Sequence, residues 1–218
     1  MKPIVVIIGF LIAGCNSTDQ KSVNYKQEKI NQIENRDTAL QNGDLIFHTS
    51  QSNQSEAIQI VTNSKYSHVG IIYREGNIVY VYEAVQPVKI TKLNDWINRG
   101  ENGRYVVKRL KNSDRILTEK SVQKMKIIGR KYLGKDYDLR FEWSDDKIYC
   151  SELVWKIYKE AFNVEIGELE RIGDFDLSDK SVQTKVKERY GDKVPKDELI
   201  ITPDRMFNSN NLVTIIEK

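Results

Sequence analysis

Cys150 is the residue of this sequence best placed to act as a nucleophile. It stands directly before a segment, 151–162, whose apolar residues recur with the spacing of an amphipathic helix. The first turn of a helix presents free N–H groups and a partial positive charge, which lower the pKa of a cysteine from about 8.5. The same N–H groups can bind an oxyanion. A buried structural cysteine is the alternative interpretation, because free cysteines are among the most buried residues of proteins.

A thiol nucleophile needs a base, and the chain contains two histidines. His68 precedes a predicted strand at 69–73, and His48 follows a shorter one at 45–47. Either side chain could instead be a hydrogen-bonded structural imidazole, which needs no catalytic partner.

A base in turn needs an acceptor that fixes its tautomer, and Glu83 is the candidate. Residues 69–73 and 78–84 are predicted to pair as a β-hairpin around a turn at 75–77. The expected register places His68 opposite residue 84, one position from Glu83. A bulge or a shift of one residue would bring the two side chains together. A Glu83 that faces solvent is the alternative.

Short strands and amphipathic helices must position these groups, and they do not alternate strictly along the chain, which predicts an α+β domain. Asn53 is a plausible N-cap of the first helix, with Glu56 three residues later. Residues 164–200 are highly charged and difficult to assign, apart from a helix at 181–190. The predicted strands are 45–47, 69–73, 78–84, 104–110 and 212–216, and the predicted helices are 53–62, 118–133, 151–162 and 181–190.

The composition is that of a soluble globular body. The 218 residues suffice for one ordinary domain, and hydrophobic residues make up 39% of them. The net charge is only +3, from 34 basic and 31 acidic side chains scattered among one another. No basic block or nucleic-acid motif is present, so no nucleic-acid partner is expected.

The N-terminal residues have the pattern of a secretion signal. Lys2 precedes an apolar run, 4–13, which is shorter than the roughly 20 residues of a membrane span and suits a signal peptide. The run ends in Leu-Ile-Ala-Gly-Cys and resembles a bacterial lipobox, in which Cys15 becomes the lipidated N-terminus. An ordinary secretory signal or an uncleaved anchor is the alternative.

The lipobox resemblance divides the chain into three parts. Residues 1–14 are expected to be a lipoprotein signal peptide. Residues 15–36 would be the lipidated cysteine and a polar tether, with a short helix at 25–35, and residues 37–218 would be the folded domain. This predicts an extracytoplasmic protein anchored to a bacterial membrane by its N-terminal lipid.

Six short segments of the sequence form an ordered set: Asn42–Phe47, Ser67–Ile71, Tyr82–Ala84, Gly134–Asp138, Tyr149–Val154 and Ile201–Asp204. Together they resemble the circularly permuted branch of the NlpC/P60 superfamily, the YiiX-like papain-fold proteins. In that branch the histidine precedes the cysteine in the chain, as here. Residues from Val164 to Leu199 match no part of the pattern and could form a wall of the substrate cleft.

The resemblance implies a papain-like α+β fold and a cysteine hydrolase. Cys150 would be the nucleophile, His68 the base and Glu83 the residue that orients it. Tyr137 and Ser151 would contribute to oxyanion or substrate binding, although a half-buried structural tyrosine is an equal alternative for Tyr137. No metal or other cofactor is expected, since the histidines and cysteines lack zinc-ligand spacing.

The expected substrate is a peptide or amide, with cell-wall peptide as the leading candidate. Two alternatives remain open at this point. The same Cys-His site could serve a lipid acyltransferase or thioesterase, or the chain could be a non-catalytic binding lipoprotein on a related scaffold.

Overall fold

The computed structural model describes residues 17–52 and 54–218 and divides the chain into two compact units, 1–39 and 40–218. The first unit contains one described helix, α1 (Ser17–Ala39). This helix is longer than the short one predicted at 25–35. The predicted signal peptide and Cys15 lie outside the described residues.

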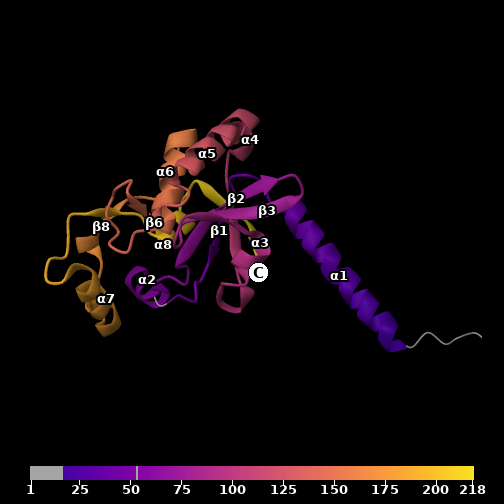
Figure 1. Ribbon diagram of the computed structural model, residues 1–218, viewed down its shortest axis with the longest axis horizontal. Helices are drawn as coiled ribbons and strands as arrows, with labels where there is room; N and C mark the ends of the chain where they lie inside the picture. The colour runs from indigo at the N-terminus through magenta and orange to yellow at the C-terminus, as the bar shows by residue number, and fades with distance from the viewer. Residues whose placement is uncertain (1–16, 53) are drawn as a thin grey trace, which may run out of the picture. The chain divides into compact units, whose positions relative to one another are not determined.

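The second unit is built on a six-stranded antiparallel sheet with the order β10-β5-β1-β2-β3-β4. Helix α6 packs on β2 and β3, and α5 packs on α6, so both helices cover one face of the sheet (Figure 1). The other face carries α3. The predicted α+β class is therefore correct. The strands of the sheet are β1 (Leu45–His48), β2 (His68–Glu75), β3 (Ile78–Glu83), β4 (Lys89–Lys92), β5 (Val106–Leu110) and β10 (Leu212–Glu217).

Outside the sheet, the described residues of the second unit form seven helices and four short strands. Helices α2 and α7 pack against each other at one end of the unit. The helices are α2 (Ser55–Thr62), α3 (Leu93–Ile97), α4 (Ser113–Ile116), α5 (Glu119–Tyr132), α6 (Cys150–Phe162), α7 (Lys180–Tyr190) and α8 (Pro203–Phe207). The short strands are β6 (Asp136–Tyr137), β7 (Lys147–Ile148), β8 (Glu170–Arg171) and β9 (Leu199–Ile200), and two 3₁₀ turns lie at Glu101–Gly103 and Ile172–Asp174.

Alternation along the strands gives the sheet two apolar faces. Leu45, Phe47 and Ile71 belong to the core shared with α5 and α6, whereas Ile46 and Ile72 belong to a second core that includes Trp96 of α3. Both faces of the central strands are thus buried. This explains why β1 and β2 are continuous apolar runs and do not alternate between apolar and polar residues.

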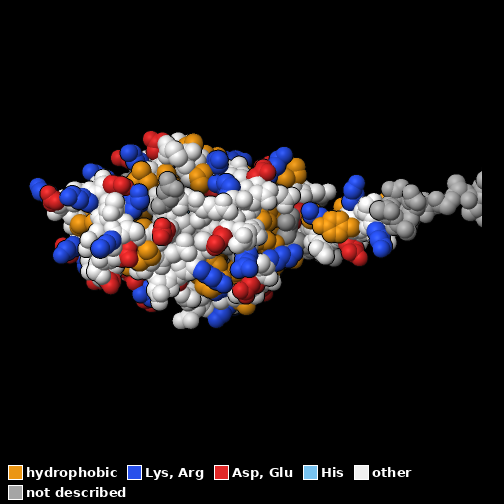
Figure 2. Space-filling model, turned by 90° about the horizontal axis from the view of Figure 1, so that it is seen from below, with side chains coloured by type: hydrophobic (Ala, Val, Ile, Leu, Met, Phe, Trp, Pro, Cys, Tyr) orange, Lys and Arg blue, Asp and Glu red, His pale blue; other side chains and the backbone are white. Residues whose placement is uncertain are grey.

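The predicted apolar faces of the two main helices are confirmed. Helix α5 buries Val122, Met125, Gly129 and Tyr132, and α6 buries Leu153, Val154, Ile157, Tyr158 and Ala161. Thr118 caps α5 by accepting the N–H of Ser121. Helix α2 differs from its prediction, since Gln54 precedes it without a side-chain cap and Asn53 lies outside the described residues. On the face seen in Figure 2, basic and acidic side chains are interspersed.

Among the described residues, no helix combines the length and the apolarity needed to cross a membrane. The second unit ends the chain with β10, which pairs with β5 and closes one edge of the sheet. The N-terminal half of the second unit contributes β1 to β5, and α5 and α6 follow them in the chain. The fold therefore brings the start of β2 and the start of α6 together, although they are far apart in sequence.

Candidate active site

Cys150 is the first residue of α6, not the residue before it. Only 2% of its surface is exposed. Burial alone would raise the pKa of the thiol. Hydrogen bonds from His68 and from the backbone N–H groups of Val69 and Ser151, with the charge of His68, outweigh burial and lower the pKa. These contacts stabilise the thiolate form of Cys150 relative to that of a free cysteine.

The N–H of Val69 is available to the thiolate because of where the sheet ends. Strand β3 stops at Glu83, one residue short of the position opposite Val69 in the β2–β3 register. The sheet therefore does not use this donor. The start of β2 contributes two groups to the nucleophile, the N–H of Val69 and the ring of His68.

The two neighbours of Cys150 hold it in place through a single residue, Ile201. The N–H of Ile201 donates to the hydroxyl of Tyr149 at 3.1 Å, and its carbonyl accepts from the hydroxyl of Ser151 at 2.7 Å. All three residues are buried. The hydroxyl of Ser151 is thus committed to the backbone, and only its N–H faces the nucleophile.

His68 is oriented by Glu83 across the hairpin. Its Nε2 lies 2.7 Å from Oε2 of Glu83, which leaves Nδ1 for Cys150. Burial would lower the pKa of the imidazole, but hydrogen bonds and charges of Cys150 and Glu83 raise it to about 9. At neutral pH His68 is therefore an imidazolium paired with the thiolate.

The register of the hairpin makes this contact without a bulge. Ile71 pairs with Tyr82, so Glu83 faces Gly70 and becomes the diagonal neighbour of His68 on the same face of the sheet. The register predicted from the sequence was wrong by one residue. In that register Glu83 would have been on the face of the sheet opposite to His68. Gly70 is required here, because a Cβ at this position would lie 2.3 Å from Cγ1 of Val81.

Glu83 is fully buried and each of its oxygens has a partner. Oε2 accepts from His68, and Oε1 accepts from Thr91 at 2.6 Å and from Arg99. Burial would raise the pKa of this carboxyl, but the hydrogen bond and charge of His68, with Thr91 and Arg99, lower it to about 2. The carboxylate is therefore ionised and fixed in place.

Trp96 packs a flat surface against both histidines. Its ring stacks on His48 with 3.8 Å between centroids and lies 5.8 Å from the ring of His68. Burial first, and then the charge of His68, lower the pKa of His48 to about 2. His48 is therefore neutral and supports the ring stack, while His68 carries the charge.

Tyr137 lies beside the thiolate. It belongs to the short parallel pair β6–β7, and the side chain of Gln86 accepts its backbone N–H at 2.6 Å. Burial and the charge of Cys150 raise the pKa of the phenol well above 10, and the hydroxyl forms a hydrogen bond with Cys150. Tyr137 therefore remains a proton donor toward the reacting atoms.

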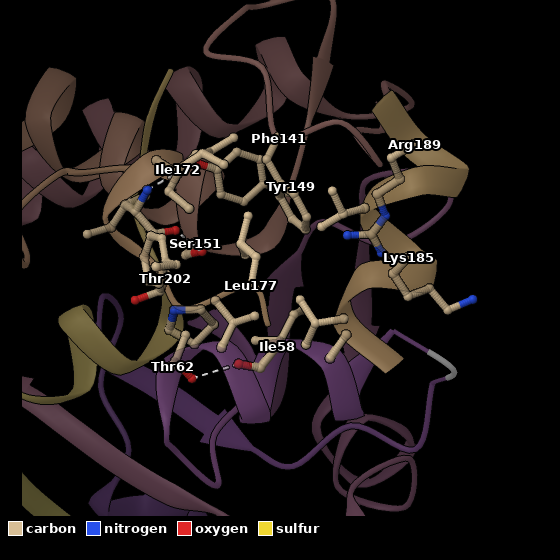
Figure 3. Close-up of a pocket in the computed structure, with 18 of the residues that line it drawn as sticks. Ile58, Thr62, Phe141, Tyr149, Ser151, Ile172, Leu177, Lys185, Arg189 and Thr202 are labelled. Atoms are coloured by element: carbon tan, nitrogen blue, oxygen red, sulfur yellow. Dashed lines mark hydrogen bonds between the residues drawn. The ribbon is translucent and has the colours of Figure 1, made fainter. Parts of the chain in front are cut away.

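Two cavities meet at these residues, and Tyr137 lines both. The first is a cleft lined by His68 together with residues such as Ser50, Gln54 and Arg99. The second, which we call the apolar pocket, begins at Cys150 and runs between α2 and α7 (Figure 3). Its other walls come from the loop around Phe141 and from residues 200–203.

The structure thus brings together Cys150, His68, Glu83 and Tyr137, as the sequence predicted, with the backbone of Ser151. Sequence reasoning missed Thr91, Arg99, Trp96 and the N–H of Val69. The first three lie in a stretch, 85–103, for which no element was predicted. A chemical signal was absent, because each acts through a contact that only the folded sheet creates.

Comparison with known proteins shows the family to which the chain belongs. Residues 39–216 match the family model of the permuted papain-like amidase enzymes, YaeF/YiiX, C92 family. The chain belongs to this family. It is 44% identical over 178 residues to the uncharacterized protein YiiX of Escherichia coli K12, covering 82% of this chain and 87% of that protein. The match to the C92 family includes the residues 164–199 that carried no resemblance of their own.

A crystal structure of YiiX from Escherichia coli O157:H7 has the same fold. It superposes with a TM-score of 0.78 at 45% identity and covers 82% of this chain and 97% of its own. That structure is described as one of a metalloprotein. In the part of the present C92 chain that is described, no three His, Cys, Asp or Glu side chains lie together so as to hold a metal ion. Both ring nitrogens of His68 are engaged, one by Glu83 and the other by Cys150.

Proposed function

We propose that the protein is a cysteine amidase in which Cys150 is the nucleophile, His68 the general acid and base, and Glu83 the residue that orients His68. The observation that carries the proposal is the continuous chain of contacts from Cys150 through His68 to Glu83. Membership of a permuted papain-like amidase family supports the same chemistry.

Acylation would begin from the thiolate–imidazolium pair. The Cys150 thiolate attacks the carbonyl carbon of the amide, and the carbonyl oxygen takes the negative charge. His68 then gives its proton to the leaving nitrogen, the C–N bond breaks, and a thioester with Cys150 remains. Helix α6 contributes N–H groups at the position of the oxyanion, and Tyr137 contributes its hydroxyl.

Deacylation would use the same groups in reverse roles. The neutral imidazole of His68 accepts a proton from water, and the hydroxide oxygen attacks the thioester carbonyl. The C–S bond breaks, the carboxylic acid leaves, and the thiolate–imidazolium pair is restored. Glu83 stabilises the imidazolium at each stage, since Thr91 and Arg99 keep it ionised and in position.

For the substrate we propose a peptide or amide, with cell-wall peptide as the leading candidate. The setting we propose is extracytoplasmic, with the protein held to a bacterial membrane by a lipid on Cys15. The lipobox-like sequence before Cys15 supports this setting. Interspersed surface charge gives no support for a nucleic-acid partner.

The apolar pocket favours a second candidate, in which the same site transfers or hydrolyses a lipid acyl group. The pocket starts at Cys150 and its walls are mostly aliphatic and aromatic, so an acyl chain would lie in it with its carbonyl at the thiolate. An intact, charge-paired Cys150 and His68 argue against a purely non-catalytic binding protein.

The proposal is tested by the rate at which Cys150 reacts with iodoacetamide as a function of pH. The full chain with Cys15→Ser carries Cys150 as its one thiol. We expect an apparent pKa well below about 8.5, lost in His68→Ala and kept in His48→Ala. A thiol that titrates near 8.5 in the parent, or that resists alkylation, would remove the basis for the enzyme assignment.

The substrate classes are then separated by turnover. Fluorogenic acyl amides, cell-wall peptides and acyl esters would be compared on the same chain, with Cys150→Ala as the blank. Amide cleavage that requires Cys150 supports the amidase, and ester cleavage or acyl transfer without amide cleavage supports the second candidate.

A further inference from the structure

Among the described residues that line the apolar pocket, Arg189 is a charged side chain paired with no carboxylate. The walls of the pocket include Ile58 of α2, Leu177, Val182 and Val186 of the α7 region, and Phe141. Figure 3 shows the guanidinium of Arg189 directed from α7 toward these apolar side chains, whereas the ammonium group of Lys185 points away. A cation therefore projects into a space that is otherwise suited to hydrocarbon.

The partners of Arg189 differ from those of comparable side chains. Among the described residues, Lys185 pairs with Glu188 at 2.9 Å and Arg205 with Glu170 at 2.5 Å. Within the same part of the chain, the contact recorded for Arg189 is with the ring of Phe141, 5.1 Å from guanidinium carbon to centroid. A guanidinium over a ring face keeps the N–H donors at its edge available for a planar anion.

Phe141 is held in an unusual conformation to make this contact. Its φ is 53°, in the left-handed region that a bulky residue rarely adopts. The carboxylate of the buried Asp138 imposes the turn by accepting the N–H groups of Arg140 at 2.7 Å and Glu142 at 2.6 Å. Strained residues of this kind cluster at ligand sites, because the surrounding structure must maintain them.

The charge of Arg189 also acts near the nucleophile. It opposes the rise in the pKa of Tyr137, the phenol beside Cys150. Because Arg189 and Cys150 line the same pocket, an anion bound at Arg189 would lie in the same cavity as the reacting carbonyl and would be part of the acyl side of the substrate.

We propose that Arg189 is a specificity-determining residue, which binds a carboxylate carried by the apolar acyl part of the substrate. The inference rests on the proposed function and narrows its substrate class to amides of acidic, otherwise apolar, acyl groups. Apolar walls bind the hydrocarbon, and the guanidinium selects the acidic group by a charge-assisted, two-point hydrogen bond.

Binding to a chain without the nucleophile tests this proposal separately from catalysis. The full chain with Cys15→Ser and Cys150→Ala is titrated by calorimetry with octanoate and with octanamide, its neutral isostere. We expect octanoate to bind about tenfold more tightly, or better. Arg189→Gln should abolish that preference. Lys187→Gln, which removes the same charge from an exposed position of α7 outside the pocket, should keep it.

Each other outcome overturns the proposal. A preference that survives Arg189→Gln, or that Lys187→Gln removes equally, would show that Arg189 does not select the ligand. Equal binding of the two probes, or binding of neither, would have the same meaning. An inert thiol in the alkylation experiment would defeat the amidase assignment but would leave the probe preference unchanged.

Discussion

Replacement of Glu83 by Gln should reveal how much of the charge on His68 depends on that carboxylate. Gln has nearly the same shape and still offers an oxygen to Nε2, but it removes the negative charge. In the parent, the contact is 2.7 Å long and fully buried, so solvent screens it little. The expected result is a lower pKa for His68 in a chain that keeps its fold.

The size of the effect follows from the protonation of His68. Its pKa of about 9, against the ordinary 6.5, corresponds to about 3 kcal/mol in favour of the imidazolium, at 1.36 kcal/mol for each pH unit. Both Cys150 and Glu83 contribute hydrogen bonds and charge to this shift. Burial opposes the shift, so the two partners together contribute more than the net rise, and Glu83→Gln should lower the pKa of His68 by at least about one, to near 8 or below.

The assay is an NMR titration of the histidine rings in the full chain with Cys15→Ser. The chain has two histidines, and His48, with a pKa near 2, should not titrate in the neutral range. Glu75→Gln is the matched control, since it removes the same charge from the exposed end of β2. Titration of the Cys150→Ala chain measures in the same way how much Cys150 contributes to the pKa of His68.

If the pKa of His68 is unchanged in a folded Glu83→Gln chain, the carboxylate of Glu83 does not stabilise the imidazolium, and the prediction is wrong. A fall of equal size in Glu75→Gln would refute it as well. That result would attribute the shift to the net charge of the hairpin.

Three further outcomes are expected. Tyr137→Phe should lower the rate of acylation by about 10- to 100-fold with little loss of stability, as measured by single-turnover kinetics, because it removes one donor beside Cys150. Gly70→Ala should destabilise the domain by about 1–3 kcal/mol in urea unfolding, because its Cβ would lie 2.3 Å from Val81. The ionised carboxylate of Glu83, with a pKa of about 2 in place of 4.5, stabilises the fold above pH 4.5 and loses this contribution as the pH falls toward 2. Unfolding free energies of parent and Glu83→Gln should therefore converge over that range, by about 3 kcal/mol.

The sequence was sufficient to predict the elements with strong local signals. The apolar period of α6 and the β-branched run of the β2–β3 hairpin both appear where they were expected. The register of the β2–β3 hairpin was not predicted correctly. Turns of two and of three residues have similar sequences, yet the length of the turn decides on which face of the sheet Glu83 lies. Composition does not encode that difference.

The supporting residues could not be found in this way. Thr91 and Arg99 reach Glu83 through β4 and the end of α3, which are short elements without a clear period. For residues 164–200 the sequence predicted a helix at 181–190 and suggested a wall of the substrate cleft, without indicating which residues would form it. Their role as a wall of the apolar pocket depends on the packing of α7 against α2, which is a long-range contact.

Ile201 links the wall of the apolar pocket to the residues on either side of the nucleophile. Its N–H and carbonyl bind the side chains on either side of Cys150, while Ile201 and its neighbours Ile200 and Thr202 form part of the pocket wall. A ligand that displaces this wall must therefore also displace the first turn of α6. Binding in the pocket and the orientation of the Cys150 sulfur are therefore coupled. A substrate that fits this wall without moving Ile201 also keeps the sulfur in position for attack.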